Sequence, residues 1–200
     1  MTLEGPKVLL GLALGSRESY DSWLDFGRDL VARGLRAPAL VVADGAPGLW
    51  KAARELWPAA EEQRCTVHAL RNVTAKLSER HHREVKARYW AVFDEAASVA
   101  EARRGLEALM GDYRSAFPSA VGVIERDLDA LVAHLRWPSE HRKRIRSTNL
   151  LERTLRRGPP AHEGDRALSR RDVGAVADLG GARAVLARLA RRRDDAPGGR

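Results

Sequence analysis

The stretch Ala39-Leu40-Val41-Val42-Ala43-Asp44-Gly45 decides the fold class of this 200-residue chain. Five consecutive apolar residues that end at an Asp-Gly pair are typical of a β-strand buried on both faces of a sheet. A second apolar run, residues 8–14, precedes it, and Trp23, Phe26 and Leu30 recur at helical spacing between the two runs. This strand–helix–strand order predicts an α/β fold with a partly parallel sheet.

The pattern changes to long amphipathic helices at about residue 80. Apolar residues recur every three or four positions in 85–96, 106–113 and 124–135, and Pro118 and Pro138 interrupt this pattern. From about residue 158 the chain is rich in Arg, Ala, Gly, Asp and Pro, and it contains no Lys, Phe, Trp, Tyr, Ile or Asn. We therefore expect a poorly ordered tail after a helical region.

Composition narrows the classes of function. The chain has 35 Lys and Arg against 27 Asp and Glu, a net charge of +8 that favours a polyanionic partner. Its one cysteine excludes an internal disulfide and fits a reducing cytoplasm. The apolar runs are too short to span a bilayer and no secretory leader opens the chain, so we expect a cytoplasmic protein without a membrane partner.

Asp44 is the first candidate functional residue. Open α/β sheets hold their ligands at the carboxyl ends of strands, and Asp44 ends the buried run, with Gly45 allowing the backbone to turn away. The alternative is a structural role, in which the Asp44 side chain initiates a turn or caps a helix that begins at Pro47.

The block Gln63-Arg64-Cys65-Thr66-Val67-His68-Ala69-Leu70-Arg71-Asn72 is the second candidate. Cys65 and His68 have the spacing of half a zinc site, but such a site needs two more ligands, and no second cysteine exists. We therefore favour a buried thiol and a hydrogen-bonded histidine at the start of a helix. A reactive Cys–His pair in a basic ligand-binding domain is a further alternative.

Glu152 is the third candidate, because it is the only acid among seven Lys and Arg between His141 and Arg157. It is either a solvated partner of the neighbouring arginines or a carboxylate that holds a divalent cation while the arginines bind phosphates. The residues before it, Ser147 or Thr148, are suitable as the N-cap of a helix.

The order of these motifs resembles the Mutator-type family of bacterial insertion-sequence transposases over residues 5–154. The matching blocks are Ala43-Asp44-Gly45-x-x-Gly48-Leu49, Trp57-Pro58, Gln63-Arg64-Cys65-x-x-His68-x-x-Arg71-Asn72, Trp137-Pro138 and Ser147-Thr148-Asn149-x-x-Glu152. The resemblance implies a retroviral-integrase-like (RNase H-like) core with an all-α insertion and a catalytic triad of two aspartates and a glutamate. Asp44 matches the second aspartate and Glu152 the glutamate, and both would bind Mg²⁺ or Mn²⁺.

The resemblance also assigns supporting and DNA-binding roles. The residues expected to support the core are Cys65, His68, Arg71, Asn72, Trp137, Thr148 and Asn149. Those expected to hold the DNA backbone, together with Arg71, are Arg64, Arg142, Lys143, Arg144, Arg146 and Arg153. The implied partner is double-stranded DNA, both element ends and target, in a bacterial, nucleoid-associated setting.

These boundaries follow from the resemblance: 1–80, a partial RNase H-like α/β core; 81–138, an α-helical insertion; 139–157, the helix of the catalytic glutamate; and 158–200, the tail. Two departures qualify the expected activity. Asp21, Asp25 and Asp29 lie in a predicted helix, so none matches the family's first aspartate, and the match ends soon after Thr154, as a shifted reading frame would produce.

We therefore expect a transposase fragment that is catalytically impaired alone. The alternative is a non-catalytic DNA-binding or inhibitory fragment that associates with full-length transposase; a homo-oligomer is a further possible assembly.

Overall fold

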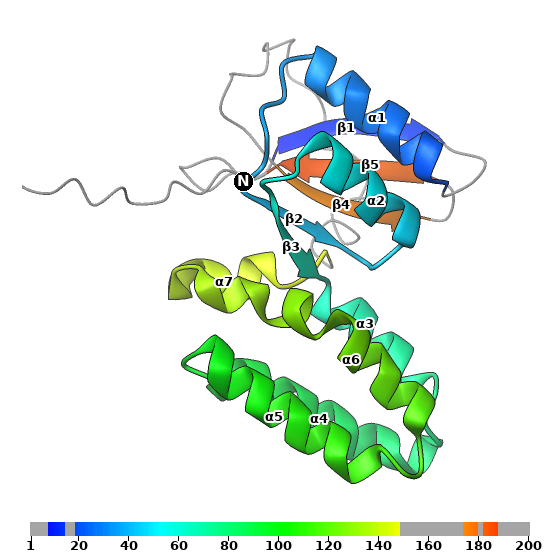
Figure 1. Cartoon of the computed structure of the whole chain (residues 1–200), viewed down its shortest axis with the longest axis vertical. Coiled ribbons are helices and arrows are strands. Elements are labelled where there is room, and N and C mark those ends of the chain that lie inside the picture. Colours follow the sequence, from blue (N-terminus) through cyan, green and yellow to red (C-terminus); the bar gives the residue numbers. More distant parts are fainter. Residues whose placement is uncertain (1–7, 15–18, 149–173, 180–181, 188–200) are drawn as a thin grey trace, which may run out of the picture.

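The computed structural model describes residues 8–14, 19–148, 174–179 and 182–187, and it combines a small sheet with a larger helical region (Figure 1). The strands are β1 (Val8–Leu14), β2 (Leu40–Ala43), β3 (Glu61–Arg64), β4 (Gly174–Leu179) and β5 (Ala182–Ala187). They lie in the order β1-β5-β4-β2-β3. β2 is parallel to β3 and β4, whereas β5 is antiparallel to β1 and β4. The strands predicted at 8–14 and 39–43, and a partly parallel sheet, are confirmed.

The region expected to be a poorly ordered tail supplies two of the five strands. β4 and β5 pair with each other in antiparallel register, from Gly174 opposite Ala187 to Leu179 opposite Ala182. The sequence between them is Gly180-Gly181, a pair typical of tight hairpin turns. The structure thus differs from the expectation at residues 174–179 and 182–187, while 158–173, 180–181 and 188–200 lie outside the described residues.

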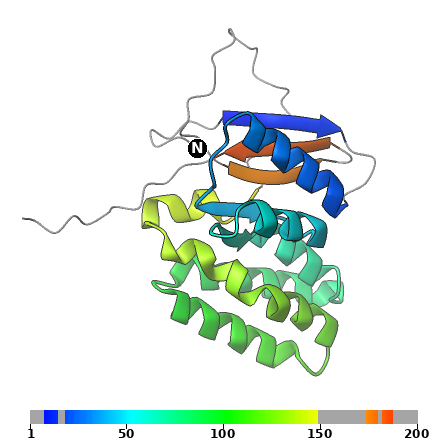
Figure 2. The ribbon, with the colours of Figure 1, turned by 45° about the horizontal axis from the view of Figure 1, so that its top comes forward.

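Helices α1 (Tyr20–Ala32) and α2 (Pro47–Leu56) cover one face of the sheet (Figure 2). Ser19 caps α1, since its hydroxyl accepts a hydrogen bond from the Ser22 amide at 3.2 Å, and Pro47 occupies the first turn of α2. Their apolar sides form one core with β2. The larger buried side chains in this core are Trp23, Leu24, Phe26, Leu30, Leu49, Trp50 and Trp57.

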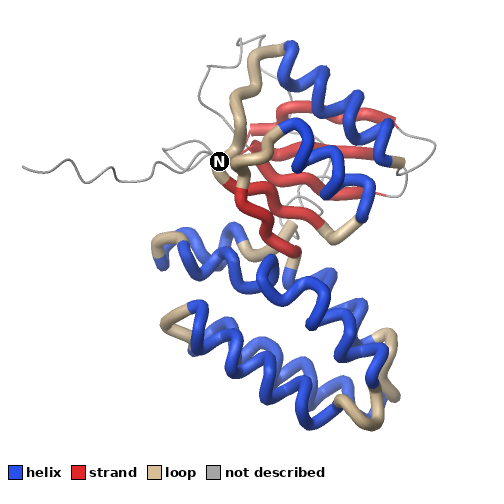
Figure 3. The backbone as a smooth tube through the Cα atoms, in the orientation of Figure 1, coloured by secondary structure: helices blue, strands red, loops and turns tan. Residues whose placement is uncertain are grey.

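The helical region lies beside β3 (Figure 3). Its helices are α3 (Thr66–Thr74), α4 (Glu79–Glu95), α5 (Val99–Tyr113), α6 (Pro118–Val132), the 3₁₀ helix η1 (Ala133–Arg136) and α7 (Ser139–Ile145). α3 buries Ala69, Leu70 and Val73 in the core that α4, α5 and α6 share. α3 therefore packs with the helices that follow it, and the predicted domain boundary at residue 81 stays a prediction. No helix in the described ranges is long and apolar enough to cross a membrane.

His134 is a buried histidine whose protonation opposes folding. Its ring is fully buried, and its Nδ1 lies 3.1 Å from the Gln63 Oε1 atom. Burial, together with the positive charge of Arg146, lowers the pKa of His134 to about 4, against about 6.5 in an unfolded chain. Between these values the unfolded chain binds a proton that the folded chain does not, so stability falls as the pH falls.

We accordingly expect His134 to account for a loss of about 2 kcal/mol in the free energy of unfolding between pH 7.5 and pH 5. Urea unfolding at both pH values would measure this loss, and His134→Gln, which cannot titrate, serves as the comparison. Equal pH dependence in the two proteins would assign the effect to other groups.

Candidate active site

Asp44 follows the last residue of β2 at the carboxyl end of the strand, next to a tight turn. Its Oδ1 atom accepts a hydrogen bond from the Ala46 amide at 3.1 Å, so one carboxylate oxygen fixes the turn. Gly45 has φ +98°, a left-handed conformation that favours glycine. No cation within the described part of the chain pairs with the half-buried Asp44 carboxylate. The turn role and a ligand role are therefore compatible, because the carboxylate has a second oxygen.

Four consecutive residues, 63–66, connect this edge of the sheet to the helical region. Gln63, Arg64, Cys65 and Thr66 are each at most 1% exposed. The Gln63 Oε1 atom accepts from the backbone amide of His134, and the Thr66 amide and hydroxyl both donate to the Arg146 carbonyl oxygen. This part of the motif block is a buried junction, and sequence reasoning did not identify Gln63 or Thr66 as functional.

Arg64 forms an ion pair inside this junction. Its Nε atom lies 2.9 Å from the Oδ2 atom of Asp127 on α6, and the Arg64 side chain is 1% exposed. Burial opposes ionisation of Asp127, but hydrogen bonds from Arg126 and Arg64 hold the pKa of this carboxyl below its usual range. The expectation that Arg64 holds a DNA phosphate does not fit this burial. Its guanidinium is committed to Asp127 instead.

Cys65, His68 and Thr148 meet at the start of α3. The Thr148 amide and hydroxyl lie 3.3 and 3.4 Å from the Cys65 Sγ atom, and the hydroxyl is also 3.4 Å from the His68 Nδ1 atom. Cys65 is fully buried, which raises its pKa, but hydrogen bonds from His68 and Thr148 outweigh burial and bring the pKa to about 7. These contacts hold Thr148 next to Cys65, the residue that follows β3.

We expect Thr148→Val to raise the pKa of Cys65 by about one pH unit, the equivalent of one lost hydrogen bond of about 1.4 kcal/mol. The absorbance of the thiolate near 240 nm, titrated with pH, reports this value for the single cysteine of the chain. Thr74→Val is a matched control, because the Thr74 hydroxyl bonds only to carbonyls of its own helix. An unchanged Cys65 midpoint in Thr148→Val would contradict the assignment.

The predicted basic residues divide into two groups. Arg142 and Arg146 act within the fold: the Arg142 Nε atom donates to the Trp137 carbonyl, and Arg146 pairs with Asp94 at 2.8 Å and lies over the Trp90 ring. The Trp137 ring nitrogen donates to Glu61 on β3. The residues that are exposed, and so accessible to a phosphate, are Arg71, Asn72, Lys143 and Arg144.

Asn149, Glu152 and Arg153 lie outside the described residues, so their predicted roles stay predictions. Asp127 is a functional candidate that sequence reasoning missed. It lies three residues after Ile124 and four before Leu131, both buried, which places it on the apolar stripe of α6. A carboxylate on such a stripe indicates a buried partner, and this was the available signal.

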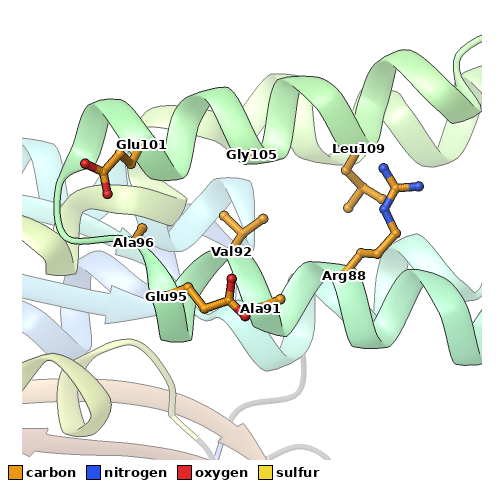
Figure 4. Close-up of a pocket in the computed structure, with 8 residues that line it drawn as sticks. All are labelled: Arg88, Ala91, Val92, Glu95, Ala96, Glu101, Gly105 and Leu109. Atoms are coloured by element: carbon orange, nitrogen blue, oxygen red, sulfur yellow. The ribbon is translucent and has the colours of Figure 1, made fainter.

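Two other features of the described structure bear on where a site can lie. Within the described ranges, no three His, Cys, Asp or Glu side chains group so as to hold a metal ion. A groove between α4 and α5 has a volume of about 360 Å³ and is lined by residues including Arg88, Val92 and Glu101 (Figure 4). None of the predicted site residues lines this groove. The candidate site therefore remains the edge of the sheet at Asp44.

Comparison with known proteins identifies the family of the chain. The sequence model described as "Transposase, Mutator family" matches residues 1–158. The chain belongs to this family of transposases. The transposase for insertion sequence element IS6120 of Mycolicibacterium smegmatis is 39% identical over 152 residues, which cover 76% of this chain and 47% of that protein.

A second relative of this Mutator-family chain is the transposase for insertion sequence element IST2 of Acidithiobacillus ferrooxidans. It is 39% identical over 156 residues, which cover 78% of this chain and 52% of that protein. The Mutator-family chain thus spans about half the length of these curated relatives. The predicted family is confirmed, and the matched residues include all three predicted candidates, Asp44, the 63–72 block and Glu152.

Proposed function

We propose that this chain carries part of the catalytic core of an insertion-sequence transposase that cleaves and joins DNA with divalent cations. In this proposal the core is RNase H-like, the helices within residues 81–138 are its insertion, and Asp44 and Glu152 are catalytic carboxylates that hold Mg²⁺ or Mn²⁺. The family supplies the reaction class, and the chain's own residues supply the positions of the acids.

One observation carries the proposal: a short chain of hydrogen bonds connects the strand end of Asp44 to the segment that precedes Glu152. The Cys65 amide donates to the Ala43 carbonyl at 2.7 Å, and the Thr148 amide lies 3.3 Å from the Cys65 Sγ atom. Thr148 is four residues before Glu152. This connection supports, from the described residues, a fold that brings two acids distant in sequence to one edge.

The chemistry of Asp44 fits a magnesium or manganese ion. These cations prefer carboxylate oxygens and keep several waters, and Asp44 presents a half-buried carboxylate at a strand end with no cationic partner among the described residues. A bound cation would polarise a phosphodiester oxygen and lower the pKa of an attacking water or hydroxyl. The residues of the chain would hold and orient the carboxylates around it.

Catalytic impairment of the chain alone is part of the proposal. None of the acids in the described residues before Asp44 takes the position of a third carboxylate, because Asp21, Asp25 and Asp29 all lie on the exposed side of α1. β1 reads Val-Leu-Leu-Gly-Leu-Ala-Leu, without an acid. This observation also favours the second candidate function, a non-catalytic DNA-binding or inhibitory fragment that pairs with full-length transposase.

Both candidate functions, the impaired transposase core and the non-catalytic fragment, require binding to duplex DNA. We expect Lys143→Gln with Arg144→Gln to lower the slope of log affinity against log salt by about 2, since each released counterion contributes about 0.9. Fluorescence anisotropy with a labelled duplex at several salt concentrations measures this slope. Arg103→Gln with Arg104→Gln on α5 is a control of equal charge, and an equal loss of slope in the control would show that the binding is not local to α7.

A further inference from the structure

A buried arginine supports the turn that carries Asp44. Arg64 ends β3 and lies opposite Ala43 in the parallel register, so it stands beside the strand end from which Asp44 leaves. Its guanidinium is buried with a single ion pair, to Asp127, and its Nη1 atom has no hydrogen-bond partner in the described part of the chain. Burial of a cation costs desolvation free energy that a single ion pair often does not offset, and apolar side chains of similar volume often fill a core at least as well.

The guanidinium is packed directly against Gly45. A Cβ atom added to Gly45 would lie 2.5 Å from both the Cζ and Nε atoms of Arg64 and 3.0 Å from its Nη1 atom. With its φ of +98°, Gly45 is therefore fixed both by its backbone conformation and by the arginine beside it. The space on that side of the turn is filled, so the turn cannot relax toward β3.

The turn in its present form sets the Asp44 carboxylate, whose Oδ1 atom accepts from the Ala46 amide. We propose that Arg64 is a positioning residue for Asp44: held by Asp127 of the helical region, its guanidinium supports Gly45 and fixes the direction in which the Asp44 carboxylate leaves β2. The metal-binding role of that carboxylate rests on the proposed function, whereas the coupling between Arg64 and the turn does not.

The coupling joins the helical region to the candidate site. Asp127 is also held by Arg126, with its Oδ1 atom 3.0 Å from the Arg126 Nε atom, so the carboxylate that grips Arg64 is itself fixed on α6. Arg64 thus contacts both α6, through Asp127, and the turn at Asp44, through Gly45.

Amide hydrogen exchange at Ala46, followed by NMR in the full chain, tests the proposal, because this amide donates to Asp44. We expect Arg64→Met and Arg64→Lys each to speed Ala46 exchange at least tenfold. Arg64→Lys keeps a cation for Asp127, so its melting temperature should lie close to that of the parent. Its Ala46 amide should still exchange as fast as in Arg64→Met. Arg146→Leu, which removes another partly buried ion pair away from the turn, should leave Ala46 exchange near that of the parent.

Two results would overturn the proposal. The first is that the Ala46 amide of a folded Arg64 variant exchanges as slowly as in the parent. If Arg64→Met does not fold, Arg64→Lys serves for this comparison. The second is that Arg64→Lys restores both the melting temperature and the slow exchange, which is the result expected if Arg64 acts only as an ion-pair partner. Mn²⁺-induced broadening of the Asp44 and Ala46 signals in the parent is measured separately: its absence counts against the metal site of the proposed function and leaves the exchange result standing.

Discussion

Asp44→Asn is expected to weaken Mn²⁺ binding at the end of β2 by about 100-fold or more. The amide is nearly isosteric and can still accept the hydrogen bond from Ala46, so the turn should survive while the charge that binds the cation is lost. Loss of an outer-shell partner alone lowers metal affinity 10- to 100-fold, and loss of a ligand should do at least as much. Mn²⁺ titration, followed by the broadening of the Ala46 amide signal, measures the change.

The matched control is Asp25→Asn on the exposed side of α1, which changes the net charge equally without touching β2. Equal Mn²⁺ affinity in the parent and Asp44→Asn would refute Asp44 as a ligand. Metal-dependent joining of element-end DNA by the chain alone, lost in Asp44→Asn, would show a complete active site and contradict the proposed impairment.

The sequence predicts the parts of the fold whose patterns are local. Apolar runs identify β1 and β2, and the three- to four-residue spacing identifies the helices of the helical region. β4 and β5 escape this reasoning because they lie in a stretch rich in Arg, Ala and Gly, a composition typical of disorder. Their strand form depends on pairing with each other and with β1 and β2.

The site is predictable to a similar extent. The order of motifs places Asp44, Cys65 and Thr148 in one predicted site. In the structure the Cys65 amide donates to the Ala43 carbonyl, and the Thr148 amide donates to the Cys65 Sγ atom. Sequence alone gives Arg64 to DNA because the chain carries a net charge of +8 and the resemblance implies a DNA partner. Its true partner, Asp127, is 63 residues away, and only tertiary packing brings the two together.

The Arg64–Asp127 pair also predicts the largest change in stability. Asp127→Asn leaves the Arg64 guanidinium buried without a counterion, and removing one member of a buried ion pair lowers the free energy of unfolding by about 3–5 kcal/mol. The pair connects β3 to α6, so both the sheet and the helical region lose stability when it is broken. Urea unfolding at pH 7.5, monitored by circular dichroism, measures the difference.

Asp112→Asn is the matched control, because Asp112 pairs with Arg88 across α4 and α5 at side chains that are 60% and 37% exposed. Water solvates both charges when that pair is broken, so the loss should stay below about 1 kcal/mol. Comparable losses in the two variants would mean that the Arg64 guanidinium reaches water when Asp127 is removed. If burial of the unpaired charge causes the loss, adding Arg64→Met to Asp127→Asn should recover most of the free energy of unfolding.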